Sequence, residues 1–182
     1  MKYWSRSTLS IYKYLLSMSN AIDKSISDTG KNSNSVTLQK FQTTYFQTNK
    51  ILELIDRKRK IINIKVAVEK ALAKLSRNDR RILTLTYVDG VKCEMIASIM
   101  GVSLRTYFRR KNSALDRYTT MLEALGYDEE FFVGEYSCEK WFLAVYDDCL
   151  SKGGENDNLD RYLIKRLINE VSCVTKQFNS FA

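Results

Sequence analysis

Hydrophobic residues recur at helical spacing along almost the whole chain. Leu, Tyr and Ile residues lie at roughly helical spacing from about Ser7 to Ile26, which predicts a first helix. The polar segment SDTGKNSNS, residues 27–35, predicts a loop. A long helix is expected from about Val36, with or without a break near residues 57–60. Because no stretch alternates cleanly between apolar and polar residues, we expect an all-α fold that begins with an antiparallel helical hairpin.

Three shorter helices with clear end signals are predicted in the middle of the chain. Ser76, followed three residues later by Asp79, is typical of a helix start, and Asp89–Gly90 is expected to end that helix. The segment KCEMIASIM predicts a second helix. Ser103 is expected to cap a longer third helix, which ends at Gly126.

Beyond Gly126 the chain becomes aromatic and acidic. Residues 151–158 predict a loop, and LDRYLIKRLINEVSCVTKQF predicts a last helix with one apolar stripe. We divide the chain into an N-terminal helical segment (1–67), a helix-turn-helix domain (68–126) and a C-terminal helical subdomain (127–182).

Charge is distributed unevenly among the 182 residues. Residues 127–182 hold 6 Lys and Arg against 11 Asp and Glu, a net charge of −5. Because the whole chain carries +8, residues 1–126 carry +13, and residues 57–117 alone hold 16 basic and 5 acidic residues, or +11. One sign of charge in one half indicates either a polyanionic partner or an exposed basic surface without a partner.

Several classes of function are disfavoured by composition. The chain has no histidine, which removes the commonest general base and metal ligand, so we expect neither an enzyme nor a bound cofactor or metal. The cysteines are far apart in sequence, and we expect all four to be reduced: Cys93, Cys138, Cys149 and Cys173. No apolar run approaches the ~20 residues of a membrane span, and no export signal is recognised, so a cytoplasmic protein is expected.

The stretch IASIMGVSLRTYFRRKNSAL fits two helices that cross over a tight turn. Such a crossing needs a small residue on the first helix and a residue that tolerates positive φ in the turn, which Ala97 and Gly101 supply. Apolar neighbours should bury the joint. The residues predicted to form the turn and its packing are Ile96, Ala97, Met100, Gly101, Val102 and Tyr107.

The second helix of this stretch has one apolar face and one basic face. Tyr107, Ala114, Leu115 and Tyr118 should pack inward, with the stem of Lys111 alongside. Arg105 and Arg109 are candidates for base edges in the major groove, and Arg110, Lys111 and Arg117 for phosphates. The residues expected to contact DNA are Ser103, Arg105, Thr106, Arg109, Arg110, Lys111, Asn112 and Arg117.

The segment from ALAKLSRNDRRILTLTYVDG to SLRTYFRRKNSALDRY resembles region four of bacterial sigma factors, and its run TYFRRKNSAL especially resembles the ArpU-like phage and prophage transcriptional regulators. This resemblance implies DNA contacts at Ser103, Arg105, Thr106, Arg109 and Arg110. Lys111 stands where region four usually has an apolar residue. No region two is recognisable, so a complete sigma factor is not expected.

These observations favour a sequence-specific transcription regulator, an activator of phage or prophage late genes. It is expected to bind double-stranded DNA and to contact RNA polymerase, as a monomer or homodimer. Two alternatives stay open: a DNA-packaging subunit similar to a small terminase, and a module that binds an acidic protein. The aromatic residues of the C-terminal segment are too many for a simple electrostatic mask. We expect them to bury against the N-terminal helices or a second subunit.

Overall fold

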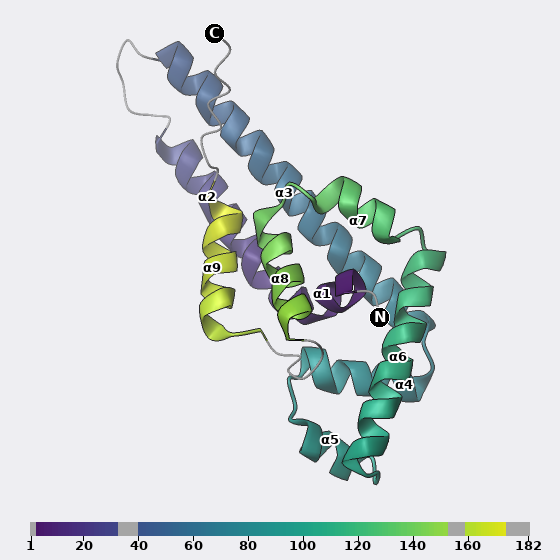
Figure 1. The fold of residues 1–182 in the computed structure, drawn as a ribbon. Coiled ribbons are helices and arrows are strands. Elements are labelled where there is room, and N and C mark those ends of the chain that lie inside the picture. The colour runs from purple at the N-terminus through teal and green to yellow at the C-terminus, as the bar shows by residue number, and fades with distance from the viewer. Residues whose placement is uncertain (1–2, 33–39, 153–158, 174–182) are drawn as a thin grey trace.

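Helices account for almost all of the described residues (Figure 1). The computed structural model describes residues 3–32, 40–152 and 159–173, and no strand occurs in these ranges. The prediction of an all-α fold is therefore confirmed. In chain order, the elements are α1 (Tyr3–Tyr12), α2 (Leu15–Asn32), α3 (Lys40–Lys74), α4 (Arg77–Leu83), the π-helical turn η1 (Thr84–Val88), α5 (Cys93–Ile99), α6 (Leu104–Ala124), α7 (Glu129–Tyr136), α8 (Lys140–Ser151) and α9 (Arg161–Ser172).

The N-terminal helices differ in two places from the sequence-based prediction. The first helix is not continuous, because a turn between α1 and α2 is closed by a bond from Tyr14 N to Ile11 O of 2.8 Å. The predicted loop at 27–35 is also wrong over its described part, since α2 continues through Gly30 to Asn32. By contrast, α3 runs without a break through residues 57–60. Figure 1 shows α2 and the first half of α3 extending side by side beyond the other helices.

Helix α1 lies at the centre of the molecule, in contact with α3, α6 and α8 (Figure 1). All its residues from Trp4 to Ile11 are buried, including the polar ones. The Thr8 hydroxyl donates to Ser5 O at 2.7 Å, so the hydrogen bond of 2.9 Å between the Thr8 and Tyr118 hydroxyls is donated by Tyr118. This bond satisfies a buried hydroxyl of α6 and attaches that helix to the core.

The C-terminal helices close the same hydrophobic core. Phe132 of α7 stacks on Trp4 of α1 with ring centroids 4.9 Å apart, and on Phe142 of α8 at 5.6 Å. Leu167 and Val171 of α9 are buried in this cluster too. The expectation that the aromatic C-terminal segment packs against the N-terminal helices is confirmed for these residues. Residue 178, which was expected to join them, lies outside the described ranges.

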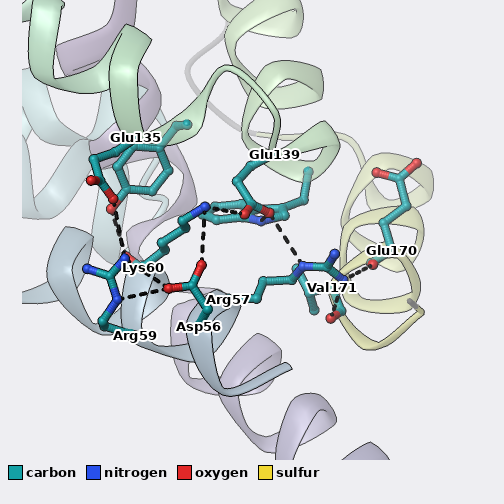
Figure 2. A network of polar contacts seen from close by, with 10 residues as sticks. Asp56, Arg57, Arg59, Lys60, Glu135, Glu139, Glu170 and Val171 are labelled. Atoms are coloured by element: carbon teal, nitrogen blue, oxygen red, sulfur yellow. Dashed lines mark hydrogen bonds and ion pairs between the residues drawn. The ribbon is translucent and has the colours of Figure 1, made fainter. Parts of the chain in front are cut away.

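Ion pairs join α3 to the C-terminal helices along with the apolar contacts (Figure 2). The carboxylate of Glu139, at the start of α8, lies 2.8 Å from Lys60 Nζ and 3.4 Å from Arg57 Nε. It also accepts a hydrogen bond of 2.8 Å from Trp141 Nε1. Glu139 is buried, and the hydrogen bonds from Lys60 and Trp141 together with the ion pair with Arg57 compensate for the loss of its hydration.

The basic cluster of α3 consists of residues 57–60. Its members also contact backbone carbonyls and other acidic side chains. Arg57 Nη1 donates to backbone carbonyls at the end of α9, including Val171 O at 3.1 Å, and so satisfies orphan acceptors of that helix terminus. Arg59 lies 2.9 Å from Asp56 and 3.4 Å from Glu135. Lys58 Nζ lies 2.6 Å from an oxygen of Asp23 on α2. The acidic C-terminal segment therefore neutralises part of the basic N-terminal half within the molecule.

None of the described helices is both long enough and apolar enough to cross a membrane. The division of the chain into segments 1–67, 68–126 and 127–182 remains a prediction.

Candidate nucleic-acid interface

Helices α4, α5 and α6 surround a small core of their own, separate from the main one. Its buried members are Ile82, Ile96, Ala97 and Tyr107, and half-buried residues such as Met100 and Val102 pack around them. Ala97 is 5% exposed, so the place where α5 approaches α6 has no room for a larger side chain.

The turn between α5 and α6 is a Schellman motif centred on Gly101. Gly101 has φ +63, and its N–H donates to Ser98 O at 3.1 Å. The next N–H, of Val102, donates to Ala97 O at 3.0 Å. A Cβ on Gly101 would meet no atom within 4 Å. Backbone conformation, not space, therefore requires glycine at this position.

Helix α6 is capped by Ser103, whose Oγ accepts a hydrogen bond of 3.3 Å from Thr106 N. The two hydroxyls of these residues also lie 3.0 Å apart. Ser103 thus acts as the helix cap, one of the two roles considered for it from sequence. Its side chain remains exposed at the tip of the helix-turn-helix unit.

The inner face of α6 holds the unit to the rest of the protein. Tyr107, Ala114, Leu115 and Tyr118 are all buried. The Tyr107 hydroxyl shares a hydrogen bond of 2.9 Å with Thr86 Oγ1 of η1, which itself donates to a backbone carbonyl. Burial raises the pKa of Tyr118, so its hydroxyl stays protonated and continues to donate to α1. These contacts fix the direction of α6.

The outer face of α6 presents a row of hydrogen-bond donors. Arg105, Arg109 and Asn112 are exposed and follow one another at intervals of four and three residues, which places them along one side of the helix. Arg110 is also exposed and lies on the adjacent side. None of the three arginines has an acidic partner among the described residues. Their guanidinium groups are available to an external acceptor.

Lys111 does not belong to this outer face. Its residue is 2% exposed, and Nζ lies over the ring of Phe108, 5.2 Å from the centroid. This burial does not favour a contact of the ammonium with a phosphate on the surface, and the DNA contact of Lys111 stays a prediction. The sequence contained a signal of this burial, because Lys111 stands at a position that is usually apolar in region four.

Arg117 has a structural partner that sequence reasoning missed. Its Nη1 lies 2.9 Å and 2.7 Å from the two oxygens of Asp79, the buried acidic residue in the first turn of α4. Ser76 Oγ donates to the same carboxylate at 2.8 Å and accepts from Asp79 N at 3.2 Å. The predicted helix start at Ser76 is therefore present, and it also ties α4 to α6 through Arg117. The guanidinium stays largely exposed, so its phosphate contact remains a prediction.

Two further features of the unit carried no clear signal in the sequence. The side chain of Arg80 donates to Leu72 O at 2.8 Å and Ala73 O at 2.7 Å, and so caps the C-terminus of α3. The π-helical turn η1 places Tyr87 in the main core and Thr86 against Tyr107 in the small core. The helix-turn-helix unit is thus fixed to the rest of the protein at two points.

Comparison with known proteins agrees with this geometry. Residues 65–117 match the family model described as Sigma-70, region 4. The matched segment runs from the last part of α3 to α6 and makes up less than a third of the chain. No curated protein and no solved structure gives a significant match. The chain therefore contains a DNA-binding helix-turn-helix domain like region four of sigma factors.

Proposed function

We propose that this protein is a sequence-specific transcription regulator that inserts the first turns of α6 into the major groove of double-stranded DNA. The observation that carries the proposal is the exposed row of Arg105, Arg109 and Asn112 on a helix fixed by the Gly101 turn. Arginine donates bidentately to guanine, and asparagine pairs in the same way with adenine. A rigid helix bearing both residue types on its outer side can discriminate between base pairs.

The contacts expected with the DNA backbone are separate from those with bases. Ser103 and Thr106 lie at the N-terminal end of α6, where hydroxyls and the helix dipole favour a phosphate. Arg110 and Arg117 point to the sides of the helix and are expected to contact phosphates, which position the protein without reading sequence. These assignments are based on the exposure of the residues and on their places in the helix-turn-helix unit.

RNA polymerase is the second partner of the proposal. The match to region four supports it, because domains of that family act on DNA together with RNA polymerase. The resemblance of TYFRRKNSAL to ArpU-like regulators favours the late genes of a phage or prophage as targets. In this proposal the protein works in the cytoplasm without a cofactor and catalyses no reaction.

The test is selection of bound DNA from a random pool by the full chain, followed by sequencing. We expect one short site to be enriched by the wild-type protein. The double variant Arg105→Ala/Arg109→Ala should fold, as judged by circular dichroism, and should lose that enrichment. A matched control, Lys24→Ala/Lys31→Ala on α2, removes the same charge far from α6 and should enrich the same site as the wild type.

Two outcomes would contradict the proposal. Strong binding that enriches no sequence would favour a DNA-packaging protein if light scattering also shows that the protein forms a ring of many subunits. Absence of salt-sensitive DNA binding would favour a module that binds an acidic protein.

A further inference from the structure

One side of α3 exposes large apolar side chains at regular intervals. These are Tyr45, Leu52, Ile55 and Ile62, which are 71%, 57%, 51% and 44% exposed. The intervals between them are seven, three and seven residues, which is the spacing of the core positions in a coiled coil. Thr48 and Arg59 occupy the intervening core positions and are exposed as well. Six successive core positions are therefore exposed, and four of them are apolar.

This stripe is distinct from the face that packs in the chain's own core. Leu54, Ile61 and Ile64 point to the opposite side of α3 and are fully buried. From Tyr45 to Ile62 the stripe is ~26 Å long at the ordinary helical rise. The helix is continuous, buries one face in the chain's own core and exposes a second apolar face to water. Such an exposed apolar face indicates an interaction site.

We propose that this face binds the same face of a second copy of the chain, as an antiparallel coiled coil of two α3 helices. A heptad stripe is complementary to another helix, and a two-fold axis allows one stripe to serve both subunits. The inference does not depend on DNA binding and stands apart from the proposed function.

Arg59 determines the orientation. In a parallel pair, each core residue faces its own counterpart, so two Arg59 side chains would meet in the centre of the interface. In the antiparallel arrangement, Leu52 faces Ile55 of the partner subunit, Tyr45 faces Ile62 of the partner subunit, and Arg59 faces Thr48 of the partner subunit. Every exposed apolar residue then meets another one. In this arrangement Arg59 can keep its contacts with Asp56 and Glu135 of its own chain.

The size of the stripe fits a dimer of modest strength. Four large apolar side chains exposed to this extent present on the order of 400 Å². A standard interface buries about 800 Å² on each partner, of which somewhat more than half is apolar. The four apolar residues thus supply most of the apolar area, and the polar residues beside them supply the rim.

The inference is tested by sedimentation equilibrium of the full chain at concentrations from ~10⁻⁶ to ~10⁻⁴ M. We expect a dimer for the wild type and a monomer for Ile55→Lys, with the dissociation constant raised about 100-fold or more. The matched control is Leu143→Lys, at an exposed leucine of α8, which should remain a dimer. Circular dichroism and thermal unfolding show whether each variant is folded.

Orientation is tested with single cysteines in a Cys138→Ser/Cys173→Ser background, which lacks the two exposed native thiols. Under mild oxidation, a mixture of Leu52→Cys and Ile55→Cys chains should form a mixed disulfide dimer, whereas Leu52→Cys alone should not. The inference would be overturned if the wild type is a monomer at the highest concentration. Another segment of the chain that covers the stripe would give this result. An unchanged dimer of Ile55→Lys would also overturn the inference, and efficient cross-linking of Leu52→Cys alone would overturn the antiparallel arrangement.

Discussion

Two clusters of four basic residues have the same charge in this protein and opposite surroundings. The cluster on α3 is Arg57–Lys60, and the cluster on α6 is Arg105, Arg109, Arg110 and Lys111. Acidic groups from α2, α3 and the α7–α8 region meet every member of the first cluster. The arginines of the second cluster have no acidic partner in the described part of the chain, although Lys111 is buried.

The difference shows that a local excess of positive charge does not by itself indicate a ligand. The net charge of +11 over residues 57–117 counts both clusters, but the first one is neutralised within the fold. What distinguishes the second cluster is its position on the outer side of a helix whose inner side is fixed. The exposed arginines of the second cluster therefore keep their charge available to an external partner.

The largest expected effect comes from breaking the first cluster at Glu139. In Glu139→Ala, Arg57 and Lys60 lose their shared carboxylate while they remain mostly buried. The free energy of unfolding should fall by about 3 kcal/mol, as for the removal of one partner from a buried ion pair. Urea unfolding followed by circular dichroism measures this. The control Glu130→Ala, at an exposed position of α7, should change stability by less than about 0.5 kcal/mol. A loss at Glu139 of less than about 1 kcal/mol would show that the pair behaves like an exposed one.

A matched pair of arginine variants separates the roles of the two clusters. Arg109→Ala should weaken binding to the selected DNA site by about 1–3 kcal/mol and leave the free energy of unfolding unchanged. Arg57→Ala should lower stability, because it removes the ion pair with Glu139 and the donor at the end of α9, and it should leave the affinity of the folded protein for DNA unchanged. Fluorescence anisotropy and urea unfolding measure the two quantities. If Arg109→Ala weakens binding to random DNA equally, Arg109 contacts a phosphate and not a base.

A smaller effect distinguishes two neighbours within the second cluster. The logarithm of the DNA association constant falls linearly with the logarithm of salt concentration, with a slope set by the number of phosphates contacted. Arg110→Ala should reduce this slope by about 1, because its exposed guanidinium contacts a phosphate. Lys111→Met should leave the slope unchanged, because the ammonium is buried over Phe108. Equal reductions in the two variants would support the predicted phosphate contact of Lys111.

The smallest expected effect concerns acid stability at the first cluster. Burial raises the pKa of Asp56, but contacts with Arg59 and Lys60 outweigh it and hold the pKa below the ordinary 3.8. A carboxyl whose pKa is lowered by folding stabilises the protein above its unfolded pKa, and this contribution is lost as the pH falls through the folded value. At pH 6 the free energy of unfolding should therefore be larger for the wild type than for Asp56→Asn. The difference should disappear as the pH falls below 3.8. A gap that is constant from pH 6 into acid, measured by urea unfolding, would contradict this origin.

Local signals in the sequence were sufficient to predict the helix-turn-helix unit. The cap at Ser103, the small residue at Ala97 and the glycine at 101 lie within seven residues, and each acts on its immediate neighbours. The inward face of α6 also followed from helical periodicity. The break between α1 and α2 was missed because the apolar spacing continues across it. The continuation of α2 through Gly30 was missed because a glycine within a helix costs only ~1 kcal/mol.

Contacts between distant parts of the chain could not be predicted in this way. Glu139 is 79 residues from Lys60, and nothing in the composition of either neighbourhood indicates that the two meet. The ion pair between Arg117 and Asp79 could not be predicted from the sequence either, because both residues lie in segments that suggested other roles. Charge counts along the sequence therefore overestimated the surface that faces a partner.

The central position of α1 has a consequence for how the chain folds during synthesis. Arg6, buried in this helix, donates to Cys149 O at 3.4 Å, across 143 positions of sequence. Of the described helices α1 is synthesised before the others, whereas α8, which packs on it, is made only after the DNA-binding unit. Contacts of such long sequence separation form late, because closing the intervening loop costs entropy before the contact stabilises it. The side of α1 that packs on α8 thus stays uncovered until α8 has been made, and during that time aggregation and proteolysis compete with folding.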